Sequence, residues 1–497
     1  YALTSGRYNT AIGFQALFAE DDGDKNTAVG YQALQAQTGT SGDVNNTAIG
    51  YHAGLAITTG VNNTAIGESA MVDLVEGNNN IAIGKAAMGG AMDATADASS
   101  GNIAIGKDAM GGAWDTATSD YNIAIGEQAM DDAMNDCNYN VAIGRRAATM
   151  LETGDSNIAI GADALYSAVD VDKCVVIGGD CGQGAMTSAA DATIAIGFAA
   201  LNGLTSGIGN TALGAWAGFS NAIGDYNTVV GYEAYYSGAP TDTNGRNVIM
   251  GYQSGKYITT GYSNTMIGYA AGYSVSGTPL TGDGNTVVGE GAGYLLQGSA
   301  SYNVCIGMTA GNAITTGDYN VCVGHGSDAA VTSDNQIAIG KGAVTDGANK
   351  GRWGNSSIGT NNIQTDWTVD SDVRIKKNIE DSDIGLSFIN SLKTRKYNKK
   401  HPSEYDAELL EERYKKGGAD YDDDKDEIIK DEFDDKKVWN GLIAQEVKSV
   451  MDNLDVGFSG WSEDSKGQQG IQYSTLVVPL IKAVQELSAR VEELEKK

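Results

Sequence analysis

The sequence has 497 residues, with 67 glycines but only 4 prolines, and its formal net charge is −30. This length allows more than one domain, and frequent glycine without proline indicates many tight turns rather than collagen or a disordered linker. The strong negative charge argues against binding to nucleic acid or anionic membranes, and no apolar run is long enough to span a bilayer.

Histidine and cysteine are scarce. The chain holds 3 histidines and 5 cysteines, and the cysteines form neither a CxxC pair nor a zinc-type spacing. We therefore predict no metal and no other cofactor.

Residues 1–345 consist of one short motif repeated with small variations. It begins as NTAIG at Asn9 and ends as QIAIG at Gln336, and 19 copies can be counted. Nine of the 18 intervals between motif glycines are 17 residues, and the others range from 16 to 22. A constant core with insertions at one place is typical of a solenoid whose coils share one adjustable loop.

The motif favours a strand that ends in a turn. Its apolar and β-branched residues suit a strand, and it is too short for a helix. Asparagine is its first residue in 16 of the 19 copies, so we expect the amides to hydrogen-bond along the stack. The invariant glycine predicts a turn that a Cβ atom would crowd. Three residues later the side chain is always small.

The strand core is apolar at consecutive positions, so both of its faces need cover. The coil interior can cover one face, and other copies of the chain around a three-fold axis are the economical cover for the second. At about 4.8 Å per coil, the shaft would be on the order of 90 Å long. This region resembles the β-roll head repeats of trimeric autotransporter adhesins and the shaft repeats of bacteriophage tail fibres.

Residues 346–370 are polar and form a predicted connector with room for a strand or two. From Ser371 onward the sequence no longer repeats. Helical spacing is predicted for DIGLSFINSLKTRKYNKK, where Ile384, Phe388 and Leu392 share one face, and for SEYDAELLEERYKK. The terminal segment carries apolar residues at 4-3-4-3 spacing, which predicts a coiled-coil seam formed by Leu480, Val484, Leu487, Val491 and Leu494.

Residues 371–497 resemble the intramolecular chaperone domain of endosialidases and phage tail spikes, a self-cleaving unit counted as a peptidase family. The resemblance rests on SDVRIKKNI, GLIAQEV, IQYSTLVVPLIKAVQEL and the terminal seam. An acidic insert at about 404–437 departs from the family. The implied fold class is mainly β, a trimeric β-solenoid shaft followed by a small α+β chaperone domain that ends in a coiled-coil helix.

The resemblance implies single-turnover self-cleavage between Asp370 and Ser371. Ser371 would be the nucleophile and Lys376 the base, which must be neutral to accept the hydroxyl proton. Burial of Lys376 after trimer assembly would lower its pKa and keep it neutral. The nearby cations Arg374 and Lys377 could lower this pKa further. The family motifs also include these residues: Asp372, Asn378, Gly441, Gln445, Glu446 and Tyr473.

Simpler interpretations exist for both ends of this domain. Ser371 can cap a helix, with Asp372 favouring its N-terminus, and a capping serine can still act as a nucleophile. The terminal seam can be an ordinary helix rather than a trimeric clamp.

Four further features have structural and functional interpretations. A calcium loop at 420–432 is opposed by Lys425 in the place of the turn glycine. Cys305 and Cys322 share one repeat position and suit small buried side chains better than a disulfide.

The Asp-rich stretches near 131–136 and 168–172 could hold the carboxylate pair of a glycosidase, but nothing specific in the sequence marks one. An aromatic row after the motif glycine favours shaft packing over sugar stacking, and it comprises Tyr31, Tyr51, Tyr232, Tyr252 and Tyr269.

Together these features predict a homotrimeric phage tail fibre that is made in the host cytoplasm and carried on the virion. Its expected partners are a glycan or outer-surface protein of the host cell and other virion tail proteins, without nucleic acid or membrane insertion. Two alternatives are a cell-surface trimeric adhesin and a tail spike that depolymerises glycans. A membrane-tethered transcription factor with the same domain would need a basic DNA-binding region and a transmembrane helix.

Overall fold

The computed structural model describes residues 5–38, 42–92, 98–114, 117–238, 245–355, 358, 373–400, 404–406, 421–422, 427–428, 437–463 and 467–497. The chain divides into two compact units, Tyr1–Trp353 and Gly354–Lys497.

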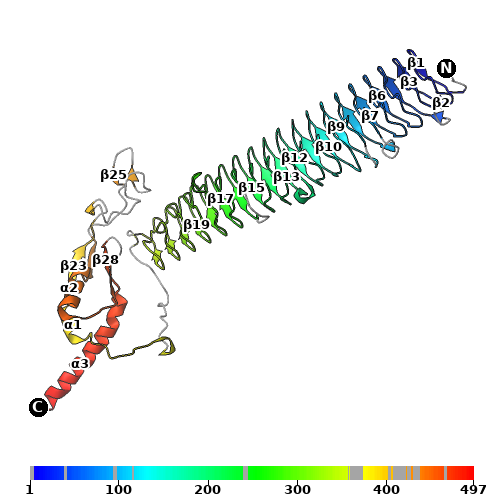
Figure 1. Ribbon diagram of the computed structural model, residues 1–497. Helices are drawn as coiled ribbons and strands as arrows, with labels where there is room; N and C mark the ends of the chain where they lie inside the picture. Colours follow the sequence, from blue (N-terminus) through cyan, green and yellow to red (C-terminus); the bar gives the residue numbers. More distant parts are fainter. Residues whose placement is uncertain are drawn as a thin grey trace. The chain divides into compact units, whose positions relative to one another are not determined.

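The first unit is a β-solenoid in which each coil contributes one short strand to a single 20-stranded parallel sheet. The strands follow one another along the solenoid (Figure 1). They are β1 (Thr10–Ile12), β3 (Thr27–Val29), β5 (Thr47–Ile49), β6 (Thr64–Ile66), β7 (Ile81–Ile83), β8 (Ile103–Ile105), β9 (Ile123–Ile125), β10 (Val141–Ile143), β11 (Ile158–Ile160), β12 (Val175–Ile177), β13 (Ile194–Ile196), β14 (Thr211–Leu213), β15 (Thr228–Val230), β16 (Val248–Met250), β17 (Thr265–Ile267), β18 (Thr286–Val288), β19 (Val304–Ile306), β20 (Val321–Val323), β21 (Ile337–Ile339) and β22 (Gly351–Trp353).

All 19 motif copies therefore form strands of one sheet, which confirms the predicted solenoid. The last strand, β22, lies within the predicted connector 346–370 and pairs with β21. A separate pair joins β2 (Gly23–Asp24) to β4 (Gly42–Asp43).

The register of the sheet places equivalent residues of successive motifs side by side. Val141 pairs with Ile158, for example, and Ala142 with Ala159. Because side chains alternate along a strand, the middle residue points inward, and Ala142 is fully buried. The small residue three positions after each motif glycine is also buried, as Ala147 illustrates.

The motif asparagines form the predicted ladder. The backbone N–H of Asn157 donates to Oδ1 of Asn140 at 2.8 Å, and Nδ2 of Asn140 donates to the carbonyl of Gly154 at 2.8 Å. The same pattern recurs on both sides of an interruption at Cys174 and Thr193, which replace asparagine. The amide thus satisfies backbone groups that would otherwise be buried without partners.

The motif glycines occupy a conformation that suits glycine alone. Gly144 has φ 138°, and a Cβ atom there would collide with the carbonyl group of Gly161 in the next coil. The collision and the backbone angle both require glycine, which confirms the predicted reason for its invariance.

A second ladder uses carboxylates and explains part of the acidic composition. The backbone N–H of Asp155 donates to Oδ1 of Asp172 at 2.8 Å, and the N–H of Asp172 donates to Oδ1 of Asp191 at 2.8 Å. These aspartates precede the strand by three residues and accept hydrogen bonds from the neighbouring coil. They are structural groups, so the negative charge is partly a product of coil stacking.

The second unit is a small α+β domain. Its elements are α1 (Leu386–Ser391), β23 (Arg395–Asn398), β24 (Tyr421–Asp422), β25 (Glu427–Ile428), β26 (Val438–Gly441), α2 (Ala444–Leu454), β27 (Trp461–Glu463), β28 (Gln469–Ile471) and α3 (Val477–Glu495). Three antiparallel pairs join β23 to β26, β24 to β25 and β27 to β28.

The helix predicted over DIGLSFINSLKTRKYNKK is only partly correct. Phe388 lies on α1 and is buried, but α1 ends at Ser391 and the following residues form β23. Pairing with β26 overrides the helical spacing, because a strand partner satisfies the backbone equally well. The helix predicted over SEYDAELLEERYKK lies largely outside the described residues, whereas the predicted terminal helix is confirmed as α3.

The core of the second unit gathers around Phe388, Val447 and Phe458. The rings of Phe388 and Phe458 have centroids 5.3 Å apart, so α1 and the segment after α2 meet across this core. Among the helices that the structure describes, none has the length and apolar character needed to cross a membrane.

Candidate functional site

The segment predicted to contain the cleaved bond begins outside the described residues. Asp370, Ser371 and Asp372 fall in this part of the chain. The description resumes with a 3₁₀ helix, Val373–Ile375. The pairing of Ser371 with Lys376 as nucleophile and base therefore stays a prediction. Arg374 and Lys376 are exposed in the single chain.

Asn378 closes this turn with a left-handed backbone, φ 53°. Asparagine tolerates this conformation better than most residues that carry a Cβ atom. The left-handed angle gives Asn378 a local backbone role between the 3₁₀ helix and α1.

Two other predicted motif residues, Gly441 and Tyr473, meet in space. The backbone N–H of Leu442 donates to the Tyr473 hydroxyl at 2.7 Å. A Cβ atom on Gly441 would collide with the same hydroxyl. The absence of a side chain at Gly441 thus allows Tyr473 to satisfy the backbone at the start of the turn that leads into α2.

Glu446 forms a paired hydrogen bond with Arg395 of β23. Arg395 Nε lies 2.9 Å from Glu446 Oε2, and its Nη2 bonds to Oε1. The hydrogen bond from Arg395 lowers the pKa of Glu446, and the same bond raises the pKa of Arg395. The pair ties α2 to the β23–β26 sheet, whereas the adjacent Gln445 is exposed.

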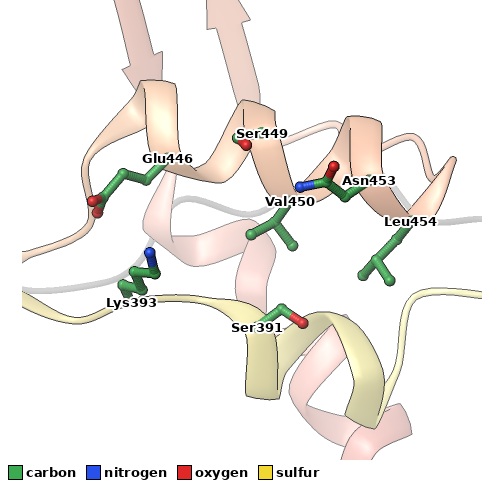
Figure 2. Close-up of a pocket in the computed structure, with 7 residues that line it drawn as sticks. All are labelled: Ser391, Lys393, Glu446, Ser449, Val450, Asn453 and Leu454. Carbon is green, nitrogen blue, oxygen red and sulfur yellow. The ribbon is translucent and has the colours of Figure 1, made fainter.

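A pocket of about 370 Å³ opens between α2 and the C-terminal end of α1 (Figure 2). Glu446 and Lys393 lie at one end, and the apolar side chains of Val450 and Leu454 extend towards the other. Ser391, Ser449 and Asn453 supply further polar groups.

The N-terminal end of α1 is capped by Glu486, which lies a hundred residues further along the chain. Glu486 of α3 accepts a hydrogen bond from the backbone N–H of Leu386 at 2.8 Å. A carboxylate at this end satisfies one of the unpaired amides and complements the helix dipole. Sequence reasoning missed the roles of Glu486 and Arg395, although both lie in or beside quoted motifs, because no local pattern indicates a partner so far along the chain.

The other sequence candidates have structural roles where they are described. Cys305 and Cys322 pair in register on adjacent strands, and both are buried free thiols. A hydrogen bond with Cys305 and burial raise the pKa of the Cys322 thiol. Asp170 and Asp172 accept backbone hydrogen bonds from Ser188 and Asp155.

The remaining candidates concern metal binding. The suspected calcium loop at 420–432 lies mostly outside the described residues. Within the part of the chain that the structure describes, no three histidine, cysteine or acidic side chains gather in a way that could hold a metal ion.

The comparison with protein families concerns the second unit. Residues 371–455 match a family described as chaperone of endosialidase. No curated protein matches the chain.

The fold and this match define the protein as a β-solenoid followed by an endosialidase-type chaperone domain. Both features fit a phage tail fibre or a spike-like protein, as the resemblance implied.

Proposed function

We propose that the protein is a homotrimeric phage tail fibre for attachment to the host surface, and that its chaperone domain directs trimer folding before it is released by self-cleavage. The fibre would be made in the host cytoplasm, joined to other tail proteins and carried on the virion. The observation that carries the proposal is the chaperone-family match, which begins at residue 371 and follows a repetitive shaft in the sequence.

The outward face of the solenoid sheet supports self-association. While the middle residue of each strand points inward, the third residue points outward, as Ile49, Ile143, Leu213 and Ile306 illustrate with exposures of 36–47%. Complete burial of such a side chain contributes about 1.5–3 kcal/mol. Even partial burial, repeated along the shaft, gives a large favourable term when sister chains cover this row.

Helix α3 supports the same assembly. Its seam residues are exposed by 46–70% in the single chain, and they are Leu480, Val484, Leu487, Val491 and Leu494. A helix with an exposed apolar seam at heptad spacing gains stability when it pairs with identical helices. Three such helices would align the chains before the shaft forms.

The proposed cleavage is an acyl transfer within one chain. The Ser371 hydroxyl oxygen attacks the carbonyl carbon of Asp370, while Lys376 takes the hydroxyl proton and delivers it to the departing amide nitrogen of Ser371. Water then hydrolyses the resulting ester, which leaves a carboxylate at Asp370 and a free amine at Ser371. Lys376 must be neutral at the start, and we assign its desolvation to the assembled trimer because the side chain is exposed in the single chain.

Denaturing gels of the expressed chain test this function. The unaltered chain should give fragments of 370 and 127 residues, which add up to the full 497. Ser371→Ala and Lys376→Ala should remain intact, while the nearby control Ser382→Ala is cleaved. Cleavage of Ser371→Ala at the same bond, or a stable monomer by light scattering, would refute the proposal.

A further inference from the structure

Aromatic side chains gather on two rows of the shaft surface between Gly197 and Gly289. One row directly follows the motif glycine and includes Phe198 and Tyr232, and the other occupies the fifth position after it and includes Tyr236. Ring contacts join Tyr232, Tyr252 and Tyr269 in the first row. In the second row they join Phe219 to Tyr236 and Tyr273 to Tyr294.

A third row, the second position after the motif glycine, lies between them. Trp216, Glu233 and Gln253 occupy this position on three successive coils. Trp216 contacts Tyr232 of the first row, and Glu233 pairs with Lys256 of the fifth-position row. The middle row therefore contacts residues of both neighbouring rows.

Three tyrosines of the first row stack face to face on successive coils. Tyr232, Tyr252 and Tyr269 stack with centroids 5.5 and 5.1 Å apart and interplanar angles of 7° and 9°. A ring inside such a stack presents its edge to solvent, so it cannot receive a sugar ring on its face. This geometry supports the packing role that the sequence favoured for these tyrosines.

Trp216 has the opposite orientation. Its indole plane makes angles of 84° with Phe198 and 89° with Tyr232. Because the tyrosines stack from coil to coil, their ring planes are roughly perpendicular to the shaft axis. The plane of a ring perpendicular to them is therefore roughly parallel to this axis, and such a ring directs its edges at the rings of the adjacent coils. The indole face is left uncovered by these two rings, and Trp216 is partly exposed.

The polar groups next to Trp216 are held in place before any ligand arrives. Glu233 Oε2 accepts hydrogen bonds from Gln253 Nε2 at 2.7 Å and from Lys256 Nζ at 2.5 Å. The side chains of Lys256 and Glu233 are only 14% and 19% exposed. Lys256 Nζ also lies 5.7 Å from the centre of the Tyr236 ring. Because these rotamers are already fixed, a ligand that binds here loses little affinity to side-chain ordering.

We propose that Trp216, Glu233 and Gln253 form the centre of a binding site for a neutral glycan. The C–H groups on one face of a pyranose ring carry slight positive charge and pack against the negative face of an indole. Sugar hydroxyls donate to the Glu233 carboxylate and accept from the Gln253 amide. The net charge of −30 disfavours acidic glycans. This inference rests on the proposed host-attachment function and names the class of receptor.

A sister chain is the competing occupant of this surface. The aliphatic row proposed for chain association lies on the outward face of the strands. The strip around Trp216, by contrast, carries the carboxylate of Glu233, the ammonium of Lys256 and the amide of Gln253. Charged groups are depleted at the core of protein interfaces because their desolvation is costly. The composition of the strip therefore favours a hydroxyl-rich ligand.

The test measures binding of the purified, cleaved trimer to immobilised oligosaccharides. Neutral probes contain glucose, galactose or N-acetylhexosamines, and sialylated and sulfated oligosaccharides serve as acidic probes. We expect binding to at least one neutral probe, and affinity at least tenfold lower for Trp216→Ala and for Glu233→Gln. The matched controls are Tyr139→Ala and Glu127→Gln. Tyr139 stacks on Tyr121 and is 61% exposed, and Glu127 is an exposed surface carboxylate. Both should bind within twofold of the unaltered trimer.

Light scattering and denaturing gels accompany each variant. The proposal is overturned if no probe binds, if only acidic probes bind, or if Trp216→Ala binds normally. Loss of the trimer in Trp216→Ala would also overturn it, because that result assigns the residue to contact between chains. Intact, cleaved trimers that fail to bind would refute the glycan site and leave the proposed assembly and cleavage standing.

Discussion

Each motif glycine carries two constraints at once, a backbone angle and a close approach between coils. Gly144 has φ 138° and faces the Gly161 carbonyl. Gly277, by contrast, has no atom within 4 Å of the place where a Cβ would stand. Substitutions at these two positions therefore distinguish the general effect of replacing a glycine on stability from the effect of the particular site.

We expect Gly144→Ala to destabilise the shaft by at least about 2 kcal/mol, because it adds backbone strain and a steric collision. Gly277→Ala should change stability by less than about 1 kcal/mol. Guanidinium unfolding curves of both variants measure the difference. Equal effects at the two sites would contradict the role assigned to the motif glycine.

Asp328 is an unusual carboxylate, because it occupies a repeat position where many other coils carry leucine, methionine or glycine. Its oxygens accept hydrogen bonds from the backbone N–H groups of Ala313 and Ala329. The residue keeps some exposure, but desolvation of its carboxyl group raises the pKa to about 7.

The raised pKa predicts the direction of a pH effect. The unfolded chain releases the Asp328 proton near pH 4, whereas the folded chain holds it up to about pH 7. The contribution of this group to stability therefore falls as pH rises between these values. We expect Asp328→Asn to match the unaltered protein at pH 4 and to exceed its free energy of unfolding at pH 8. The exposed Asp334→Asn is the control, and an unchanged pH profile for Asp328→Asn would contradict this account.

At the scale of elements, α3 has two separate roles. Glu486 reaches α1 within the domain, while the apolar seam of the same helix remains exposed. A substitution on the seam should therefore affect association without unfolding the domain.

Leu487→Asp tests this separation in a Ser371→Ala background, which keeps the domain attached to the shaft. We expect light scattering to show loss of the trimer, because a charge at a seam position has to be desolvated in the coiled coil. Gln485→Asp introduces the same charge at an exposed position off the seam and should leave the trimer intact. A trimeric Leu487→Asp protein would show that α3 does not hold the chains together.

At the scale of the whole molecule, the proposed trimer requires the three chains to pair in the correct register. Nineteen similar motifs can pair one coil out of step between chains with little local penalty, because equivalent residues still meet. A separate domain that aligns the chains before the shaft forms would remove this ambiguity, and it would no longer be needed once every coil is paired.

We expect residues 1–353, expressed without the chaperone unit, to form heterogeneous or aggregated material rather than a uniform trimer. If the chain assembles and cleaves itself as proposed, the released shaft would already be in register and should remain trimeric. Light scattering of the two preparations gives the comparison. Equal yields of uniform trimer would show that the shaft does not depend on the second unit for assembly.

The repeat was readable from sequence because its information is local. The number of coils, the asparagine ladder and the need for glycine follow from a pattern that recurs every 16 to 22 residues. In a parallel stack, each residue meets its own equivalents, so one coil predicts the contacts of the next. The terminal helix was predictable for the same reason, since its apolar spacing is a property of one segment.

Other features depended on contacts between different parts of the chain. The helix predicted past Ser391 gave way to β23, because its partner β26 lies about forty residues further along. The cap that Glu486 supplies to α1 spans a hundred residues. The perpendicular Trp216 ring depends on its neighbours in the coils on both sides.

By itself, the sequence determined the repeating unit, its number of copies and the family of the C-terminal domain, because periodicity and short motifs are encoded within single segments. Only the tertiary structure decided which atoms complete the asparagine and aspartate ladders, and where the predicted helix after Ser391 is replaced by β23. It also decided that the face of the Trp216 indole is not covered by its two aromatic neighbours. Those outcomes depend on the side chains that neighbouring coils and distant strands bring to the same place.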